Sequence, residues 1–334
     1  MNHKWSTNLI PFGPASDRFC PAGFRPAIST REKVLLAKQI EGLDGVELHF
    51  PSMFEEMTPA QMKAFLDEQG LECSIVSPVM ASDPAWQLGS LSNPDPGVRA
   101  DAVQRVKDAM DASVVLGANK LNVWLGQDGF DYPFQVDYRA SWRNLVDAIG
   151  ECASHNAEVQ LCVEPKLKQP RAYSLLGTVP KVMLLINDVG LDNVGCLFDT
   201  GHALFTNENL GEQIVLLQER DKLFHLHFND NYGDWDWDMV VGSVHYFAFV
   251  EALFWIRQTG YMGWFSLDQF PQREDPVKAL SQSIRSVKQM ERLLDRIDEQ
   301  VLLDAVACHD AIAAREALED APAGAGNGRM MTAR

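Results

Sequence analysis

The sequence has few basic residues for its length and no long apolar run. Its 334 residues include 29 Lys and Arg against 46 Asp and Glu, which gives a formal net charge of −17. A surface this acidic repels nucleic-acid phosphates and anionic lipid, so neither is expected as a partner. No stretch approaches the roughly 18–20 apolar residues of a membrane helix, and the N-terminal residues lack the apolar run of a secretory signal. These absences disfavour nucleic-acid-binding and membrane proteins.

Cysteine pairs are also absent. The six cysteines are scattered, and none forms a Cys-x-x-Cys pair. Cys162 and Cys196 lie inside apolar, strand-like runs, where a free thiol behaves as a small hydrophobe. We therefore interpret the chain as a reduced, cytoplasmic protein rather than a secreted one with disulfides.

Short apolar runs alternate with amphipathic stretches along most of the chain. The predicted strands are 8–12, 45–50, 73–79, 120–126, 159–165, 193–199, 223–229 and 264–270. The predicted helices are 30–42, 59–69, 98–116, 137–155, 178–188, 209–219, 244–258 and 276–297. Strands that alternate with helices form a parallel sheet, and this number of units in about 300 residues matches a (β/α)8 TIM barrel. A doubly wound open sheet is the competing interpretation, but no Gly-x-Gly-x-x-Gly sequence follows the first strand.

The pattern changes near the C-terminus. Residues 1–297 are predicted to form a single barrel domain. Residues 298–320 are predicted to form a short helical extension, and residues 321–334 a flexible tail rich in Gly and Ala.

Polar residues interrupt four consecutive strands at their C-terminal ends, which is where a TIM barrel carries its chemistry. Strands five to eight end on Glu164, Asp199, His227 and Asp268. A single acid there is more often a helix cap, but carboxylates brought together at one point need a cation to offset repulsion and desolvation. Oxygen ligands with one imidazole suit Mg²⁺, Mn²⁺ or Co²⁺ better than a structural zinc site.

A second polar set follows the same strands. His202 lies three residues after Asp199, and Asp236 and Asp238 form an alternating pair in the loop after strand seven. This pair could bracket a second ion, with Asp199 placed to bridge the two sites. Lys166, two residues past Glu164, points to the same face and would need an anionic or polarised substrate oxygen beside it.

Three ring-bearing residues are candidates for sugar contacts. Trp124 ends strand four, and Trp86 lies in the loop after strand three. Indole faces at a barrel mouth stack on the C–H faces of sugars, although a single Trp more often packs in the core. His49 ends strand two, where a buried core histidine is an equally good interpretation.

These segments together resemble the xylose isomerase family. VEPKLKQPR (163–171), FDTGHAL (198–204) and LFHLHFNDNYGDWDWDMVVG (223–242) are similar to its metal-binding segments. GLDGVELHF (42–50), NVWLGQDG (122–129) and IPFG (10–13) resemble its segments with a ring-opening histidine, a stacking tryptophan and an aromatic that reaches a neighbouring subunit. The resemblance is collinear over roughly residues 5–295.

The resemblance implies a role for each matching residue. One metal would be held by Glu164, Asp199, His227 and Asp268, and a second, catalytic metal by Asp199, His202, Asp236 and Asp238. Lys166 would polarise the substrate carbonyl, Trp86 and Trp124 would wall the sugar, and His49 would stand at the ring-opening position. The family also implies a homo-oligomer, a dimer or a tetramer.

Three departures from the xylose enzymes point to a different sugar. His227 stands where they have aspartate and where the related L-rhamnose isomerases have histidine. Phe50 and Pro51, rather than acids, follow His49, and the segment after residue 297 is shorter than the family's subunit-clasping arm. Another pentose or a deoxysugar is therefore expected, and D-apiose is one candidate.

The predicted function is a metal-dependent aldose–ketose isomerase that moves hydride between C1 and C2 of an unphosphorylated monosaccharide. A ketose 3-epimerase of the same superfamily, with one metal and two opposed glutamates, is the alternative. A metal-dependent endonuclease of related fold is disfavoured by the net charge of −17. A non-catalytic sugar-binding protein would not need Lys166 or two metal sites.

Overall fold

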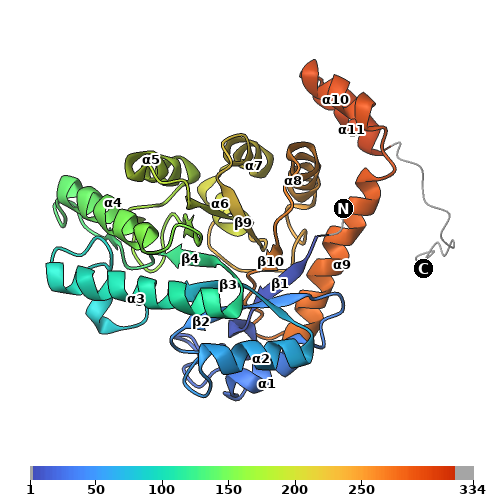
Figure 1. The fold of residues 1–334 in the computed structure, drawn as a ribbon. Coiled ribbons are helices and arrows are strands. Elements are labelled where there is room, and N and C mark those ends of the chain that lie inside the picture. The colour runs from blue at the N-terminus through green and yellow to red at the C-terminus, as the bar shows by residue number, and fades with distance from the viewer. Residues whose placement is uncertain (1–2, 320–334) are drawn as a thin grey trace.

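Eight parallel strands close into a barrel in the computed structural model, which describes residues 3–319 (Figure 1). In order around the barrel they are β1 (Trp5–Asn8), β2 (Gly45–Phe50), β3 (Glu72–Pro78), β4 (Lys120–Trp124), β6 (Gln160–Glu164), β8 (Val194–Asp199), β9 (Leu223–Phe228) and β10 (Phe265–Leu267). All neighbouring pairs are parallel, and β10 closes the barrel against β1. Because neighbours in the chain are neighbours in the sheet, the predicted (β/α)8 architecture is confirmed.

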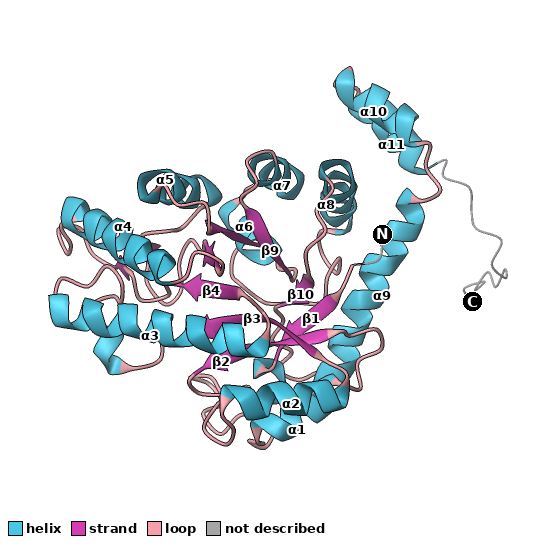
Figure 2. Cartoon of the chain, in the orientation of Figure 1, coloured by secondary structure: helices cyan, strands magenta, loops and turns pink. Residues whose placement is uncertain are grey.

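Helices cover the outside of the barrel, as Figure 2 shows. The outer helices are α1 (Thr30–Ala37), α2 (Pro59–Gln69), α3 (Pro96–Leu116), α4 (Tyr138–His155), α5 (Val179–Val189), α7 (Leu210–Gln218), α8 (Tyr246–Thr259) and α9 (Pro276–Leu294), whereas the short helix α6 (Thr200–Thr206) lies at the end of β8. The longest, α3, has clear start and stop signals: the Asp95 carboxylate accepts hydrogen bonds from two backbone N–H groups of its first turn, and Gly117 ends it with a left-handed φ of 77°. None of the described helices is long and apolar enough to cross a membrane.

The first strand begins and ends earlier than the sequence indicated. The predicted strand at 8–12 is wrong; β1 ends at Asn8, whose side-chain oxygen accepts a hydrogen bond from Ile10 N–H at 2.9 Å and turns the chain. A 3₁₀ turn (Ile10–Phe12) follows, since Pro11 has no N–H to donate to a sheet. The Phe12 side chain is only 2% exposed, so it packs in its own core instead of reaching a neighbouring subunit.

Three short elements, two strands and a helix, were not predicted. Strands β5 (Gly129–Phe130) and β7 (Tyr173–Ser174) pair as a small antiparallel sheet between the loops after β4 and β6. Helix α6 starts directly after β8, where the Asp199 carboxylate accepts a hydrogen bond from His202 N–H at 2.9 Å. This cap starts a helix at the strand end itself and keeps His202 beside it.

Alternation along the strands carries polar residues into the barrel. In β2, Val46 and Leu48 belong to the core between strands and helices, whereas Glu47 and His49 line a cavity at the barrel mouth. A separate buried apolar cluster includes Phe224. The Phe224 ring packs against Gly195, where a Cβ atom would lie only 2.4 Å from the ring carbons, so no larger residue fits at that position. Period-two alternation thus separates an apolar outer core from a polar interior mouth.

The C-terminal extension consists of α10 (Glu299–Ala307) and α11 (Ala311–Glu319), which lie beyond the end of α9 (Figure 1). Its contact with the barrel includes the Arg315 guanidinium, 3.9 Å from the centroid of the Phe247 ring in α8. The predicted tail at 321–334 lies outside the described residues.

One buried histidine gives the fold a testable pH dependence. His3 is 8% exposed and stacks on Phe265 with ring centroids 3.9 Å apart. Burial lowers the pKa of His3 to about 4. The unfolded chain, with a histidine pKa of about 6.5, therefore takes up a proton that the folded chain does not; the stability from neutral His3 is present above pH 6.5 and lost as the pH falls toward 4.

We predict that His3→Phe removes this loss. Between pH 7 and 5.5, the free energy of unfolding of the original chain should fall by about 1 kcal/mol more than that of the variant. Urea unfolding of both proteins at the two pH values measures the difference. Parallel pH profiles would show that His3 is not held neutral by the fold.

Candidate active site

A cavity of about 300 Å³ opens among the C-terminal ends of the barrel strands. The predicted site residues that line it are His49, Trp124, Glu164, Lys166, His202, His227, Asp236, Asp238 and Asp268. Asp199, which closes β8, does not line the cavity but lies in contact with its floor and is 1% exposed. The structure thus brings together residues spread over 220 positions of sequence, with one exception described below.

The floor of the cavity holds the four predicted ligands of the first metal. One ligand atom from each of Glu164, Asp199, His227 and Asp268 lies within 4.8 Å of the others. His227 Nδ1 is 3.4 Å from Asp268 Oδ2, 3.5 Å from Glu164 Oε1 and 3.6 Å from Asp199 Oδ2. Donor atoms bound at about 2.1 Å to one ion lie roughly 3.0–3.5 Å apart, so these separations are close to those of a coordination shell.

Unpaired atoms on this floor test whether a cation fits. His227 Nδ1 and Glu164 Oε1 are buried and have no hydrogen-bond partner among residues 3–319. Buried polar atoms are normally paired, so two orphaned atoms beside two further carboxylates indicate a missing positive partner. The donor set therefore fits a divalent metal ion, the group that the resemblance implies.

Neutral amides hold the carboxylates of this floor in place. Asn122 Nδ2 donates to Glu164 Oε2 at 2.7 Å, and Asn229 Nδ2 donates to both Asp199 oxygens at 3.0 and 3.1 Å. Asn8 Nδ2 donates to Asp268 Oδ1. For Glu164 and Asp268, one oxygen is held by an amide and the other faces His227 Nδ1.

The predicted second metal set is arranged differently. Asp236 Oδ2 lies 2.7 Å from Lys166 Nζ and 3.1 Å from His202 Nε2, so its carboxylate bridges two basic groups. His202 Nδ1 is 3.4 Å from Glu164 Oε1 and 3.9 Å from Asp199 Oδ1. The ligand atoms of Asp199, His202, Asp236 and Asp238, all of them described, do not converge on one point as the first set does.

Charges in this second set push neighbouring pKa values apart. Burial lowers the pKa of His202, but Asp199 and Asp236 outweigh it and raise that pKa to about 9. Burial likewise raises the pKa of Asp236, yet His202 and Lys166 hold it well below its usual range. The pKa of Asp238 is shifted in the opposite direction, because burial and the charge of Asp236 raise it well above the usual value. Two adjacent carboxyl groups are thereby fitted to opposite protonation states.

Lys166 supplies the fixed positive charge of the cavity. Its Nζ lies 5.3 Å from the centroid of the Trp124 ring, and its side chain is 14% exposed. Burial opposes its charge, but Asp236 and Asp238 raise its pKa above the ordinary value, so the ammonium group stays protonated. Among the described residues, no other Lys or Arg lines the cavity.

Two of the ring-bearing candidates have different positions. His49 lines the cavity, and burial lowers its pKa, so its imidazole is neutral; no carboxylate in residues 3–319 hydrogen-bonds to its ring. Trp86 does not line the cavity, although it was expected to contact the sugar there. It ends a 3₁₀ turn (Pro84–Trp86) capped by Asp83, and its indole is 4% exposed within the hydrophobic core.

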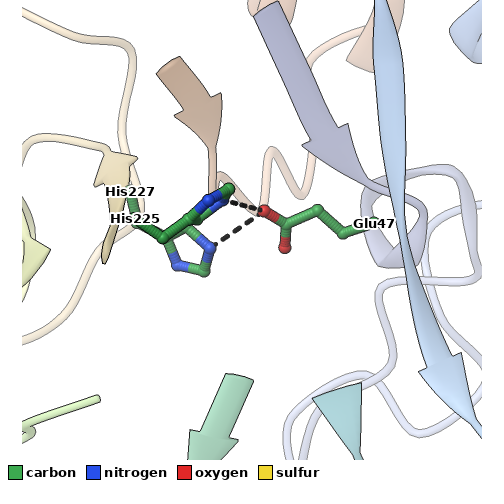
Figure 3. Close-up of side chains that lie close together, drawn as sticks. All are labelled: Glu47, His225 and His227. Carbon is green, nitrogen blue, oxygen red and sulfur yellow. Dashed lines mark hydrogen bonds and ion pairs between the residues drawn. The ribbon is translucent and has the colours of Figure 1, made fainter. Parts of the chain in front are cut away.

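Sequence reasoning missed two buried polar residues beneath the floor. Glu47 Oε1 accepts hydrogen bonds from His225 Nε2 at 3.1 Å and from His227 Nε2 at 3.0 Å (Figure 3). The signal was present, because Glu47 and His49 alternate in β2 just as His225 and His227 alternate in β9. Only the member of each pair nearer the strand end was considered.

Comparison with known proteins shows the family to which this chain belongs. Residues 34–290 match the family described as xylose isomerase-like TIM barrel, and the chain belongs to this family. A xylose isomerase of Thermus thermophilus is 28% identical over 236 residues, covering 66% of this chain and 61% of that protein. A probable sugar isomerase of Mesorhizobium japonicum is 29% identical over 293 residues, covering 83% and 66%. The chain thus spans less than two thirds of the length of each of these relatives.

Solved structures show the same fold at lower identity. A D-tagatose 3-epimerase-like protein superposes with a TM-score of 0.68 at 16% identity, covering 87% of this chain and 98% of that one. An L-ribulose 3-epimerase gives 0.69 at 16% identity, covering 88% and 97%. At this identity the likeness concerns the fold alone.

Removal of a floor ligand should abolish stabilisation by metal. Mn²⁺ at about 100 times its dissociation constant should stabilise the original chain by about 2.7 kcal/mol, because it binds only the folded state. For Glu164→Ala or Asp268→Ala, we predict that most of this metal-dependent rise in melting temperature is lost. Glu72→Ala, which removes an exposed carboxylate paired with Lys4, is the matched control and should keep the full rise. Equal rises in all variants would contradict the assignment of the floor.

Proposed function

We propose that this chain is a metal-dependent aldose–ketose isomerase acting on an unphosphorylated monosaccharide, by a hydride shift between C1 and C2. The observation that carries the proposal is the convergence of Glu164, Asp199, His227 and Asp268 beneath a cavity into which Lys166 projects. Mn²⁺, Co²⁺ or Mg²⁺ is the proposed ion, given the oxygen-rich donor set. A pentose or deoxysugar is the proposed substrate, and D-apiose is one candidate.

Size and charge favour a small neutral substrate. The cavity of about 300 Å³ lies at the lower end of the roughly 300–1,000 Å³ typical of ligand pockets. Five acidic side chains line it, against the single ammonium of Lys166: Glu47, Glu164, Asp236, Asp238 and Asp268. Lys166, already paired with Asp236, is the only Lys or Arg among the described residues of the lining, so a phosphate group would find no free basic side chain of this type, and an unphosphorylated sugar is preferred.

The cavity residues divide the proposed chemistry between them. A divalent ion on the floor would supply Lewis acidity toward substrate oxygens. Lys166 donates to the carbonyl oxygen as negative charge develops on it, and ion pairing with Asp236 holds its Nζ in position. Asp236 and Asp238 line the cavity beside Lys166 and are the proposed groups that accept and return the hydroxyl proton of the substrate.

Ring-bearing and apolar side chains around the cavity would orient the sugar. Trp124 offers an indole face beside Lys166, and the neutral imidazole of His49 can donate to or accept from a sugar oxygen. Phe270 and Met80 add apolar surface to the same wall. We further propose a homo-oligomer, a dimer or tetramer, located in the cytoplasm.

A ketose 3-epimerase is the second candidate, with Glu164 and Asp268 as opposed acid and base. Hydrogen bonds from the side-chain amides of Asn122 and Asn8 favour the isomerase. They occupy the oxygens of Glu164 and Asp268 that are turned away from His227. Such fixed carboxylates suit metal ligation better than proton exchange with a carbon atom. The shorter Asp268 also reaches less far into the cavity than a glutamate would.

Solvent isotope incorporation separates the two chemistries. A hydride shift carries the C2 hydrogen to C1 without releasing it, whereas acid–base epimerisation passes through a proton that exchanges with water. We predict that the ketose formed in heavy water with Mn²⁺ carries almost no carbon-bound deuterium, as read by mass spectrometry and proton NMR. Near-stoichiometric deuterium at carbon would replace the isomerase proposal with the epimerase.

Loss of the cavity ammonium should slow turnover strongly. Lys166→Met keeps the length of the side chain but removes its charge, and the expected fall in kcat is on the order of 100-fold. Lys63→Met is the matched control, since Lys63 lies on α2, 2.6 Å from Asp67, and does not line this cavity. Aldopentoses and deoxyhexoses screened for ketose formation supply the assay. Similar losses in both variants would contradict the role of Lys166.

The Asp236→Asn/Asp238→Asn double variant tests proton handling. Turnover should fall below detection, while Mn²⁺ affinity at the floor should change only slightly, because neither residue belongs to the converging set. Calorimetric titration with Mn²⁺ beside the turnover assay measures both. Normal turnover in the double variant would show that this pair takes no part in the reaction.

A further inference from the structure

We infer that Glu47 is a positioning residue that fixes the proton of His227 on Nε2 and so presents Nδ1 to the metal. Glu47 belongs to β2 and His227 to β9, on different sides of the barrel interior (Figure 3). The inference rests on the proposed metal dependence. It assigns a role to a carboxylate that is not among the four converging ligands.

The geometry concentrates three donors on one oxygen atom. Glu47 Oε1 accepts from His227 Nε2 at 3.0 Å, from His225 Nε2 at 3.1 Å and from the Ser266 hydroxyl. Glu47 is 1% exposed, so water does not compete for these bonds. A buried carboxylate with this many donors has one orientation available to it.

The two sides of the His227 ring have different partners. Nε2 faces Glu47, whereas Nδ1 faces Glu164, Asp199 and Asp268 and has no hydrogen-bond partner among the described residues. A neutral imidazole carries one N–H, and the nitrogen bonded to a carboxylate is the one that keeps it. Without Glu47, the carboxylates around Nδ1 would draw the proton to the side where a metal must bind.

His225 completes the arrangement from the side away from the metal. It is fully buried, its Nε2–H is directed at Glu47, and its ring stands nearly perpendicular to that of His227, at 79°. We assign it the role of holding the Glu47 carboxylate toward His227. Its removal should therefore weaken metal binding less than removal of Glu47 itself.

Glu47, His225 and His227 are also close enough to be read as ligands of a second ion. Glu47 Oε1 lies 3.1 Å from His225 Nε2 and 3.0 Å from His227 Nε2, which are hydrogen-bond distances, and an ion there in addition to the floor ion would require both ring nitrogens of His227 to be ligands at once. The positioning role makes no such demand. The nitrogen of His227 that binds the ion, Nδ1 or Nε2, distinguishes the two interpretations.

The test is calorimetric titration of the metal-free full-length chain with Mn²⁺ alone. Glu47→Leu should weaken Mn²⁺ binding by about 10- to 100-fold, whereas Glu47→Gln, whose amide oxygen still accepts the Nε2–H, should recover most of the affinity. Glu72→Leu, which makes the same change at an exposed carboxylate paired with Lys4, is the matched control and should bind Mn²⁺ as the original chain does. One ion per chain is expected in the original protein.

A spectroscopic readout keeps the test valid if Glu47→Leu folds poorly. In the original chain loaded with diamagnetic Zn²⁺, ¹⁵N NMR of labelled histidine should show His227 with its proton on Nε2 and a metal-shifted Nδ1. A proton on Nδ1, a metal-shifted Nε2 of His227, or equal Mn²⁺ affinity in Glu47→Leu and the original chain would each overturn the inference.

The outcomes also separate this inference from the proposed function. Mn²⁺ binding that depends on Glu47, without turnover of any sugar, would sustain the inference and refute the isomerase. Turnover with affinity independent of Glu47 would do the reverse. Failure of the original chain to bind Mn²⁺ at all would refute both.

Discussion

The burial of carboxylates around one imidazole is the constraint on which the rest of the site depends. Glu47, Glu164 and Asp199 are each at most 5% exposed, and all three lie within 4 Å of a nitrogen of His227. Like charges that close together in a low-dielectric interior repel strongly unless a cation lies among them. Burial lowers the pKa of His227, but Glu47 and the other carboxylates raise it well above its ordinary value, so without metal the imidazolium supplies that cation. A divalent ion would take over this role with twice the charge.

The closed barrel makes this concentration of charge tolerable. Parallel pairing fixes the register of β6, β8, β9 and β10, with Asp199 directly opposite His227, so the polar residues at or next to their C-terminal ends lie close together. Amide side chains from other strands and loops then saturate the outward oxygens, as Asn122 does for Glu164 and Asn229 for Asp199. The strands and these neutral donors together hold the remaining carboxylate lone pairs and His227 Nδ1 toward one point on the cavity floor. That preorganisation is what a binding site for a hard cation requires.

Much of this arrangement could be predicted from the sequence. Each barrel strand is a short apolar run, and a polar residue that closes such a run must lie at the mouth, which is why Glu164, Asp199, His227 and Asp268 were expected together. The limits of the prediction were local. Pro11 interrupts an apolar run that looked continuous, and only the hydrogen bond between Asn8 and Ile10 shows that β1 ends before it. Trp86 was placed by its position after a strand, whereas a capped turn buries its indole in the core. Glu47 was missed because its importance comes from β9, a strand distant in sequence, with which it shares no motif.

The central claim, that strands β6, β8, β9 and β10 converge on one buried divalent ion, is tested most directly by anomalous diffraction from crystals grown with Mn²⁺. The account predicts a single strong anomalous peak per chain, about 2.0–2.3 Å from a carboxylate oxygen of Glu164, Asp199 and Asp268 and from Nδ1 of His227. A peak on Glu47 and His225 instead, or no peak within ligand distance of His227, would contradict it.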